Sequence, residues 1–191
     1  MPYSTYLLYK PYEVMCQFSP VPGKRTLANV VQVPINVYPV GRLDYDSEGL
    51  LLLTNNKKLN AKLLHPNHKV EKEYYVQVEG MITEQALRSL SSGVTINIDG
   101  KAYVTQPAQA RQLSPPPLLP PRVPPIRYRA QIPTSWISLT LKEGKNRQVR
   151  RMTAAVGFPT LRLVRWRLGA LTIAGMQPGQ YKQLTIAPWE F

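Results

Sequence analysis

Hydrophobic and polar residues alternate along several short segments of this chain, and such alternation predicts strands with one buried face. Residues 72–80 show the pattern most clearly, with Tyr74, Val76 and Val78 on one face of the predicted strand. Residues 50–53 are four consecutive leucines, which indicates a strand that is buried on both faces. Further strands or extended segments are predicted at residues 5–10, 14–18, 33–40, 136–141, 161–171 and 181–186.

Apolar residues at helical spacing predict three helices. Residues 56–64 place leucines on one face and lysines on the other. A second helix is expected to begin after Thr83, a preferred N-cap residue, and to end at Gly93. A third helix is predicted for residues 146–156, because their apolar positions share one face and a glycine follows them.

Two shorter features complete the predicted secondary structure. Asp99-Gly100 is a turn signal between two alternating runs, so residues 94–105 are predicted to form a β-hairpin. Residues 26–31 fit one or two helical turns. Together these elements predict an α+β fold, a mixed and mostly antiparallel sheet flanked by helices, within a single domain of residues 1–191.

Residues 106–133 interrupt this pattern with nine prolines. Proline removes a backbone donor and favours extended, unpaired chain, so an exposed connection with little regular structure is expected here. Its basic side chains could contact a polyanion, or the segment could simply join two parts of the sheet, and the sequence leaves both possibilities open.

The composition limits the class of protein. Apolar residues make up 43% of the 191 positions, enough for a packed interior, and the single cysteine, Cys16, permits no internal disulfide. No signal-peptide pattern and no apolar run of membrane-spanning length is present. A cytoplasmic protein is therefore predicted.

The charge distribution points to a polyanionic partner. The formal net charge is +13, and residues 106–191 carry 13 Lys and Arg against only 2 Asp and Glu. Such an excess indicates nucleic acid, which is the commonest cellular polyanion. An anionic membrane is a weaker alternative, because it would require a basic amphipathic helix with a large apolar face.

Three acids lie immediately before the leucine strand, at Asp44, Asp46 and Glu48. Carboxylates beside a core resist desolvation unless a partner compensates them, so a charged capping loop is one interpretation and a functional site is another. Paired carboxylates could also suit glycoside hydrolysis or a divalent metal, but neither explains the basic half of the chain. His65 and His68 lack further ligands for a zinc site.

The predicted helix at residues 146–156 begins with strongly basic sequence. Arg147, Arg150 and Arg151 cluster on one of its faces, and the turn Glu143-Gly144-Lys145 precedes it. The positive end of a helix dipole together with these cations would attract a phosphate or a buried carboxylate.

Four sequence blocks, with a fifth in the same order, resemble the RsuA/RluB/E/F-type pseudouridine synthases. The blocks are Tyr9-Lys10-Pro11, Gly41-Arg42-Leu43-Asp44 with Ser47-Glu48-Gly49-Leu50-Leu51, Lys72-Glu73-Tyr74-Tyr75-Val76, Glu143 to Met152, and Leu163-Val164-Arg165 with Gly169. The resemblance extends over essentially the whole chain. It implies the pseudouridine synthase fold, with two lobes and a central cleft, and no N-terminal S4-type RNA-binding domain. Residues 121–127 and 133–136 are most similar to the E-type members, which act on the large ribosomal subunit.

The resemblance also implies a reaction and a site. Family members isomerise uridine to pseudouridine in ribosomal RNA, with no cofactor and no metal. Asp44 matches the catalytic aspartate, a nucleophile toward either the sugar C1′ or the base C6, and the sequence does not choose between these. Arg150 matches its cationic partner, Tyr74 the tyrosine that stacks on the base, and Leu163 part of the apolar wall.

The expected partner is ribosomal RNA, with 23S RNA favoured and 16S RNA left open, and the chain is expected to act as a monomer. Flipping the target uridine costs a few kcal/mol, which phosphate contacts could offset. The resemblance implies that Arg42 fills the vacated stack, as the matching arginine does in relatives. The predicted RNA-binding residues are Lys10, Arg42, Lys145, Arg147, Arg151, Arg162, Arg165 and Arg167. A non-catalytic ribosome-assembly protein that binds rRNA through the same surface is the alternative.

Overall fold

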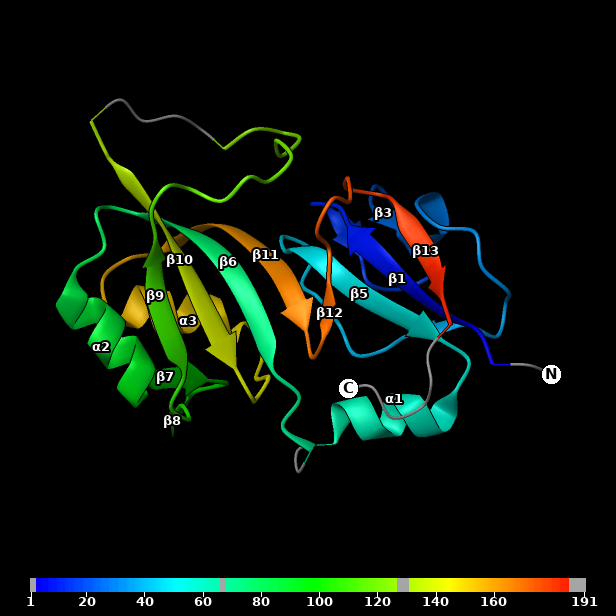
Figure 1. Cartoon of the computed structure of the whole chain (residues 1–191), viewed down its shortest axis with the longest axis horizontal. Coiled ribbons are helices and arrows are strands. Elements are labelled where there is room, and N and C mark those ends of the chain that lie inside the picture. Colours follow the sequence, from blue (N-terminus) through cyan, green and yellow to red (C-terminus); the bar gives the residue numbers. More distant parts are fainter. Residues whose placement is uncertain (1–2, 66–67, 127–130, 186–191) are drawn as a thin grey trace. The chain divides into compact units, whose positions relative to one another are not determined.

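The computed structural model of the chain describes residues 3–65, 68–126 and 131–185 (Figure 1). Its contacts divide the chain into two compact units. The first unit comprises Met1–Val70 and Arg165–Phe191, and the second comprises Glu71–Val164. These units correspond to the two predicted lobes, while the predicted cleft and the assignment of a single catalytic domain stay predictions.

The first unit is built around strand β5 (Glu48–Thr54), which contains the four leucines and is buried along its whole length. Strand β1 (Thr5–Lys10) pairs antiparallel with β5 on one side and with β13 (Tyr181–Leu184) on the other. The short β4 (Tyr38–Pro39) also pairs antiparallel with β5. A strand buried on both faces was predicted from the leucine run, and this is confirmed.

Shorter elements complete the first unit. Strands β2 (Val14–Met15) and β3 (Arg25–Thr26) pair in parallel, and the 3-10 helix η1 (Leu27–Asn29) follows directly. Helix α1 (Lys57–Leu64) is capped by Asn56, whose side chain accepts hydrogen bonds from Lys58 N and Leu59 N. The predicted helix at residues 56–64 is therefore confirmed, and Leu59 and Leu63 are buried on its inner face, whereas Leu64 is exposed. Strand β12 (Leu171–Thr172) pairs with the end of β11 (Thr160–Leu168).

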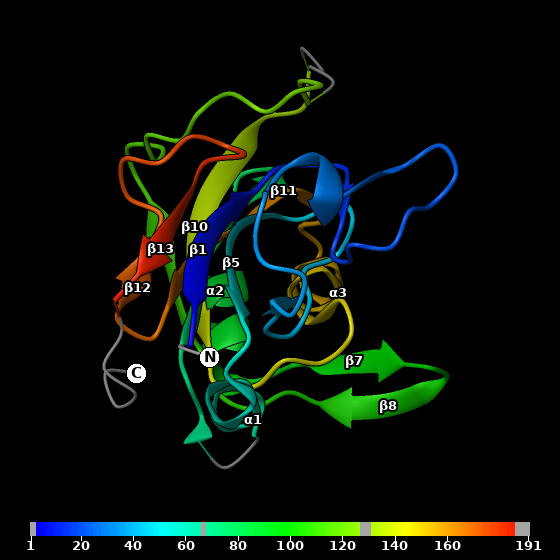
Figure 2. The ribbon, with the colours of Figure 1, turned by 90° about the vertical axis from the view of Figure 1, so that its right-hand side faces the viewer.

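In the second unit β6 (Lys72–Glu79), β10 (Thr134–Leu141) and β9 (Gln109–Leu113) form an antiparallel sheet with β10 in the centre. Helix α2 (Glu84–Ser92) lies against β9, and Thr83 caps it by accepting a hydrogen bond from Ala86 N (Figure 1). Strands β7 (Thr95–Ile98) and β8 (Lys101–Val104) run side by side as the predicted hairpin (Figure 2). Helix α3 (Gln148–Ala155) contacts β7.

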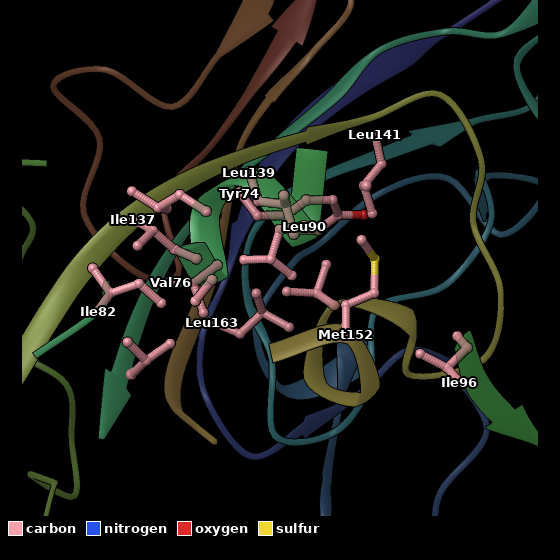
Figure 3. Packing of buried hydrophobic residues seen from close by; sticks show 14 residues of the cluster. Tyr74, Val76, Ile82, Leu90, Ile96, Ile137, Leu139, Leu141, Met152 and Leu163 are labelled. Atoms are coloured by element: carbon pink, nitrogen blue, oxygen red, sulfur yellow. The ribbon is translucent and has the colours of Figure 1, made fainter. Parts of the chain in front are cut away.

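The core of the second unit is formed by apolar side chains from its sheet and its two helices. Val76, Ile137 and Leu139 contribute from β6 and β10, and Leu90 contributes from α2. Met152 of α3 points into the same cluster (Figure 3). Burial of these groups fixes α3 against the sheet, since each buried aliphatic side chain contributes roughly 1.5–3 kcal/mol.

The prediction of little regular structure for residues 106–133 is wrong in part. Strand β9 (Gln109–Leu113) lies within this segment and pairs with β10 over five residues, from Gln109 with Thr140 to Leu113 with Trp136. The nine prolines leave residues 108–114 free of proline, so the backbone donors needed for this ladder are present. The stretch that follows β9 is held to β11 by Arg162, whose Nη2 donates a hydrogen bond to the Pro120 carbonyl at 2.8 Å.

The overall class agrees with the sequence analysis. Every strand pair given above is antiparallel except β2 with β3, and the chain also carries three α-helices within its described residues. The α+β prediction, with a mixed and mostly antiparallel sheet, is confirmed. Within residues 3–65, 68–126 and 131–185, no helix combines the length and the apolar character needed to span a membrane.

Candidate functional site

Asp44 lies at the first position of a tight turn in the first unit. Ser47 N donates a hydrogen bond to the Asp44 carbonyl at 3.1 Å, which closes the turn. Glu13 N donates to the Tyr45 carbonyl at 3.0 Å and ties the turn to the loop after β1. The Asp44 residue is half-buried, so its carboxylate sits beside a packed core and not at the tip of a free loop.

Lys10, at the end of β1, is the buried cation of this turn. Its side chain is fully buried, and its Nζ donates a hydrogen bond to the Pro11 carbonyl at 2.9 Å. Burial lowers the pKa of the Lys10 ammonium from 10.5 to about 8. Four acidic groups of the same unit act in the opposite direction, namely Cys16, Glu48, Asp46 and Asp44. Lys10 is therefore close enough to all three acids of the turn to share an electrostatic field with them.

Arg165 packs its backbone directly on Gly49 in the same unit. A Cβ on Gly49 would lie 2.3 Å from the Arg165 carbonyl oxygen, so only glycine permits this approach. The Arg165 Nε donates a hydrogen bond to the Leu50 carbonyl at 2.7 Å. Among the described residues, Arg165 Nη2 and Ser47 Oγ are buried polar atoms with no hydrogen-bond partner. Such atoms are uncommon and call for an explanation, and a bound ligand is one.

Tyr74 and Leu163 belong to one apolar cluster in the second unit. Tyr74, on β6, is opposite Leu139 of β10 in the sheet register. Leu163 contributes from β11, and both side chains are buried with 9% and 5% of their surface exposed (Figure 3). The structure thus brings together the two residues predicted to form the apolar part of the base pocket.

Helix α3 places its three arginines differently. Arg147 is the N-cap residue and has a left-handed backbone conformation with φ of 49°. Arg150 is half-buried, and its Nη1 lies 3.5 Å from the Thr160 carbonyl, the long limit for a hydrogen bond. Arg151 donates hydrogen bonds to the Asn97 carbonyl of β7 and, at 2.9 Å, to Asn146 Oδ1.

The turn before α3 is organised by Glu143. Its Oε2 accepts a hydrogen bond from the Tyr103 hydroxyl at 2.5 Å. Its Oε1 accepts from Gln106 N at 2.9 Å and from Gln148 Nε2 at 2.6 Å. The Gln148 Oε1 in turn accepts from Lys145 N at 2.9 Å, so the turn closes on the first residue of the helix.

The predicted RNA-binding residues differ widely in exposure. Arg42, Lys145 and Arg147 are exposed, whereas Arg151 and Arg167 are half-buried. Three are buried instead, and each donates to a backbone carbonyl: Lys10, Arg162 and Arg165. A buried cation of this kind does not face a phosphate at the surface, so the RNA contacts predicted for these three residues stay predictions.

The predicted site residues are divided between the two units. The first unit contains Asp44 with Lys10, Arg42, Arg165 and Arg167. The second contains the remaining predicted residues: Tyr74, Lys145, Arg147, Arg150, Arg151, Arg162 and Leu163. The pairing of Asp44 with Arg150 stays a prediction. Within the described parts of the chain, no three His, Cys, Asp or Glu residues form a group able to hold a metal.

Comparison with known proteins adds a second kind of observation. Residues 4–155 match the family described as RNA pseudouridylate synthase. The chain belongs to this family. The matched range contains Asp44, Tyr74 and Arg150, and it covers most of both units.

The most informative relatives of this pseudouridylate synthase are two proteins named "Ribosomal large subunit pseudouridine synthase E". The one from Xanthomonas campestris pv. campestris is 52% identical over 178 residues, which cover 92% of each chain. The one from Vibrio vulnificus is 50% identical over 177 residues, which cover 93% of this chain and 73% of the relative. A solved structure, "Crystal structure of pseudouridylate synthase", superposes with a TM-score of 0.78 at 25% identity, over 96% of this chain and 71% of that one.

These findings confirm the predicted family, the pseudouridine synthase fold and the assignment as an isomerase that acts on RNA. The sequence analysis of this pseudouridylate synthase missed Glu143 and Tyr103 as organising residues of the α3 turn. The sequence did contain one signal for Glu143. It is the only acid among the 80 or so residues between Gln106 and Glu190. An isolated acid inside a strongly basic segment indicates a specific internal partner.

Proposed function

We propose that this protein isomerises a specific uridine of 23S ribosomal RNA to pseudouridine. The observation that carries the proposal is the 52% identity with a ribosomal large subunit pseudouridine synthase E over 92% of both chains. Similarity over nearly the full length of both chains supports a shared substrate more strongly than a shared fold does. The strongly basic residues 106–191 are consistent with an RNA substrate.

The reaction conserves all atoms of the nucleotide. The bond between base N1 and sugar C1′ breaks, the detached uracil turns, and a bond forms between base C5 and C1′. C5 loses its proton and N1 gains one, so neither an oxidant nor a second substrate is required. The protein must therefore supply a nucleophile, a surface that tolerates rotation of a flat ring, and a place for the proton.

Asp44 is the proposed nucleophile, acting on C1′ or on C6. Its half-buried turn excludes part of the solvent, which would raise the free energy of the ionised carboxylate. We propose that Lys10 offsets this cost as an internal counter-charge, because it interacts with Asp44 from a fully buried position. Arg150 remains the proposed second cation, on the basis of its place in the family motif.

Tyr74 and Leu163 are proposed to contact the uracil ring. Both are buried in the same apolar cluster of the second unit, which suits a flat and partly apolar ligand. An aromatic face stacks on a base in any rotational setting, so the ring of Tyr74 can hold the uracil while it turns. The unpaired Arg165 Nη2 and Ser47 Oγ supply additional donors in the unit that carries Asp44.

The proposal extends to the setting of the enzyme. The partner is ribosomal RNA, contacted at the exposed Arg42, Lys145 and Arg147, and residues 1–191 act as one catalytic domain. We propose that the chain works as a monomer in the cytoplasm. We also propose that it uses no metal or cofactor, because the reaction needs neither.

The decisive experiment is Asp44→Asn measured on RNA. Purified wild type and variant are incubated with unmodified 23S RNA, and pseudouridine is read by a selective chemical label. The variant should form no pseudouridine and should bind the RNA within a few-fold of wild type. Asp99→Asn is the matched control, because it removes one exposed carboxylate at the hairpin turn and leaves the Asp44 turn untouched.

The results separate the alternatives clearly. Loss of modification in Asp44→Asn, with modification kept in Asp99→Asn, supports the enzyme. Binding by wild type without any modification would favour the non-catalytic ribosome-assembly protein. Modification of 16S RNA instead of 23S RNA would keep the chemistry and overturn the substrate.

A further inference from the structure

Glu143 is an unexpected residue at its position. It stands next to Gly144 and Lys145 in a segment where residues 106–191 carry 13 cations and 2 acids. A carboxylate on an RNA-binding surface repels phosphate, so its presence there has a cost in binding. That cost is understandable if the carboxylate performs an internal task.

The hydrogen bonds of Glu143 show what this task is. The carboxylate accepts from the Tyr103 hydroxyl of β8, from Gln106 N after β8, and from Gln148 Nε2 at the start of α3. Two of these donors belong to separate elements of the second unit, the β7–β8 hairpin and α3, and the third lies in the chain just after β8. Hydrogen bonds to an ionised acceptor are the strong ones, so Glu143 fixes the hairpin to the first turn of the helix.

Tyr103 converts this attachment into a platform for a cation. The Lys145 ammonium lies over the Tyr103 ring, with Nζ 4.9 Å from the ring centroid. This distance falls within the range of a cation–π interaction. Tyr103 is therefore held by Glu143 at its hydroxyl and holds Lys145 at its ring face. Lys145 is exposed, but its contact with the Tyr103 ring already restricts the rotamers of its side chain. It therefore loses less conformational entropy on binding a phosphate than a free surface lysine would lose.

The same hairpin contacts a second cation of α3. Arg151 donates to the Asn97 carbonyl of β7, and its other terminal nitrogen donates to Asn146 Oδ1 at 2.9 Å. Thus each strand of the hairpin contacts a basic side chain, Lys145 just before α3 and Arg151 within it. The hairpin itself carries only one basic residue, Lys101, so its contribution to binding would come from positioning and not from its own charge.

We propose that Glu143 and Tyr103 are positioning residues of the RNA-binding surface, which present the Lys145 ammonium to a phosphate of the RNA. The inference rests on the proposed RNA substrate and adds to it the β7–β8 hairpin as a functional element. Preorganisation of this kind increases affinity because less conformational entropy is lost on binding.

The test is a double-mutant cycle on RNA affinity. The dissociation constant of the full chain for a large-subunit rRNA fragment is measured as a function of salt for Tyr103→Leu, Lys145→Met and the double variant. Lys145→Met should weaken binding about five-fold and reduce the slope of log affinity against log salt by roughly 0.9, as expected for one lost phosphate contact. Tyr103→Leu should weaken binding about three-fold, the size of an exposed cation–π interaction. In the Lys145→Met background, Tyr103→Leu should have almost no further effect.

Three further variants make the result specific. Tyr103→Phe keeps the ring and loses the hydrogen bond to Glu143, so it should fall between wild type and Tyr103→Leu. Glu143→Gln retains an acceptor for Gln106 N and should also keep part of the affinity, whereas Glu143→Ala should match Tyr103→Leu. Lys142→Met is the control, because Lys142 is an exposed lysine that forms an ion pair with Glu71 at 3.8 Å. It should change affinity less than two-fold or so and should show no coupling to Tyr103.

The proposal is overturned if the effects of Tyr103→Leu and Lys145→Met are additive, or if Lys142→Met behaves like Lys145→Met. It is also overturned if all variants bind as wild type does while only their melting temperatures fall, since Glu143 and Tyr103 would then serve stability alone. Pseudouridine formation is measured on the same samples. Coupling without any modification would refute the proposed catalysis and keep this inference, and modification without coupling would do the reverse.

Discussion

A Cβ atom on Gly49 would lie 2.3 Å from the carbonyl oxygen of Arg165 and 2.6 Å from its amide nitrogen. Both contacts are to backbone, which cannot rotate away as a side chain can. Gly49 also has a φ of +108°, a conformation that other residues rarely adopt. The start of β5, just after the Asp44 turn, and the backbone of Arg165 therefore come into contact because residue 49 has no side chain.

Gly49→Ala should consequently destabilise the protein strongly, by about 3 kcal/mol or more, because backbone strain and a steric clash act together. Urea unfolding followed by circular dichroism measures this change. Gly23→Ala is the matched control, since Gly23 also has a positive φ, of +70°, but a Cβ there meets nothing within 4 Å. It should cost only about 1 kcal/mol. Equal losses of stability in the two variants would show that the close approach to Arg165 does not contribute to the effect of Gly49→Ala.

Tyr74→Phe should retain most of the catalytic efficiency, whereas Tyr74→Ala should lose nearly all of it. The reason is that the ring fills part of the buried cluster and is proposed to stack on the base. The alanine variant should also lose about 3–5 kcal/mol of stability through the cavity it leaves. Activity is therefore measured at a temperature where every variant is folded.

Val76→Ala separates the two effects of the Tyr74 substitution. Val76 is fully buried on the same strand and in the same cluster, but no contact with the base is proposed for it. It should lower the melting temperature and leave catalytic efficiency nearly unchanged. Equal activity losses in Tyr74→Phe and Tyr74→Ala would instead assign the role to the hydroxyl.

Lys10→Met should alter the pH dependence of stability. In the folded protein the pKa of Lys10 is about 8, below its unfolded value of 10.5. Between these two pH values the unfolded chain binds more protons than the folded one, so the free energy of unfolding of the wild type rises with pH across this window. The total rise attributable to Lys10 is on the order of 3 kcal/mol.

The variant lacks the titrating group, so its stability should rise less than that of the wild type over the same range. Chemical unfolding at several pH values between about 7 and about 11 measures both curves. Lys58→Met, on the exposed face of α1, is the control and should run parallel to the wild type. Parallel curves for Lys10→Met as well would contradict the buried, destabilised ammonium.

RNA binding should weaken steeply as salt is added, because each phosphate contact releases counterions. We expect affinity to fall more than about ten-fold between roughly 50 and 200 mM salt. Arg42→Gln should reduce the slope of log affinity against log salt by the amount expected for about one lost phosphate contact, since Arg42 is exposed beside the Asp44 turn. Arg25→Gln is the control, an exposed arginine of the same unit with no predicted RNA contact. A flat salt dependence would remove the basic surface from the RNA interface.

Local patterns predicted most of the secondary structure because the signals involved are short-range. The leucine run predicted β5, Thr83 and Gly93 predicted the ends of α2, and Asp99-Gly100 predicted the β7–β8 turn. Each of these depends on residues within a few positions of one another. Strand β9 was not predicted because residues 106–133 are rich in proline as a whole. The residues of β9 itself contain no proline, so their hydrogen bonds to β10 can form.

The site was harder to predict because its environment comes from distant parts of the chain. Nothing near Lys10 in the sequence indicates that its ammonium is buried, since the strand residue opposite it, Gly49 of β5, is distant in the sequence. The left-handed conformation of Arg147 likewise depends on a turn closed by Glu143 and Gln148. Family motifs predicted Asp44 and Tyr74 as site residues, but they contain no information about the environment of either side chain.

The burial of Lys10, Arg162 and Arg165 has a practical consequence for anyone who interprets binding curves of this enzyme. Counting basic residues in the sequence treats all 24 as available to the RNA. Three of them are buried and already donate a hydrogen bond to a carbonyl oxygen of the protein itself. The number of ions released per complex would therefore be too high if it were calculated from the count of basic residues. The difference from the number measured by salt titration would show how many of the cations are used inside the protein.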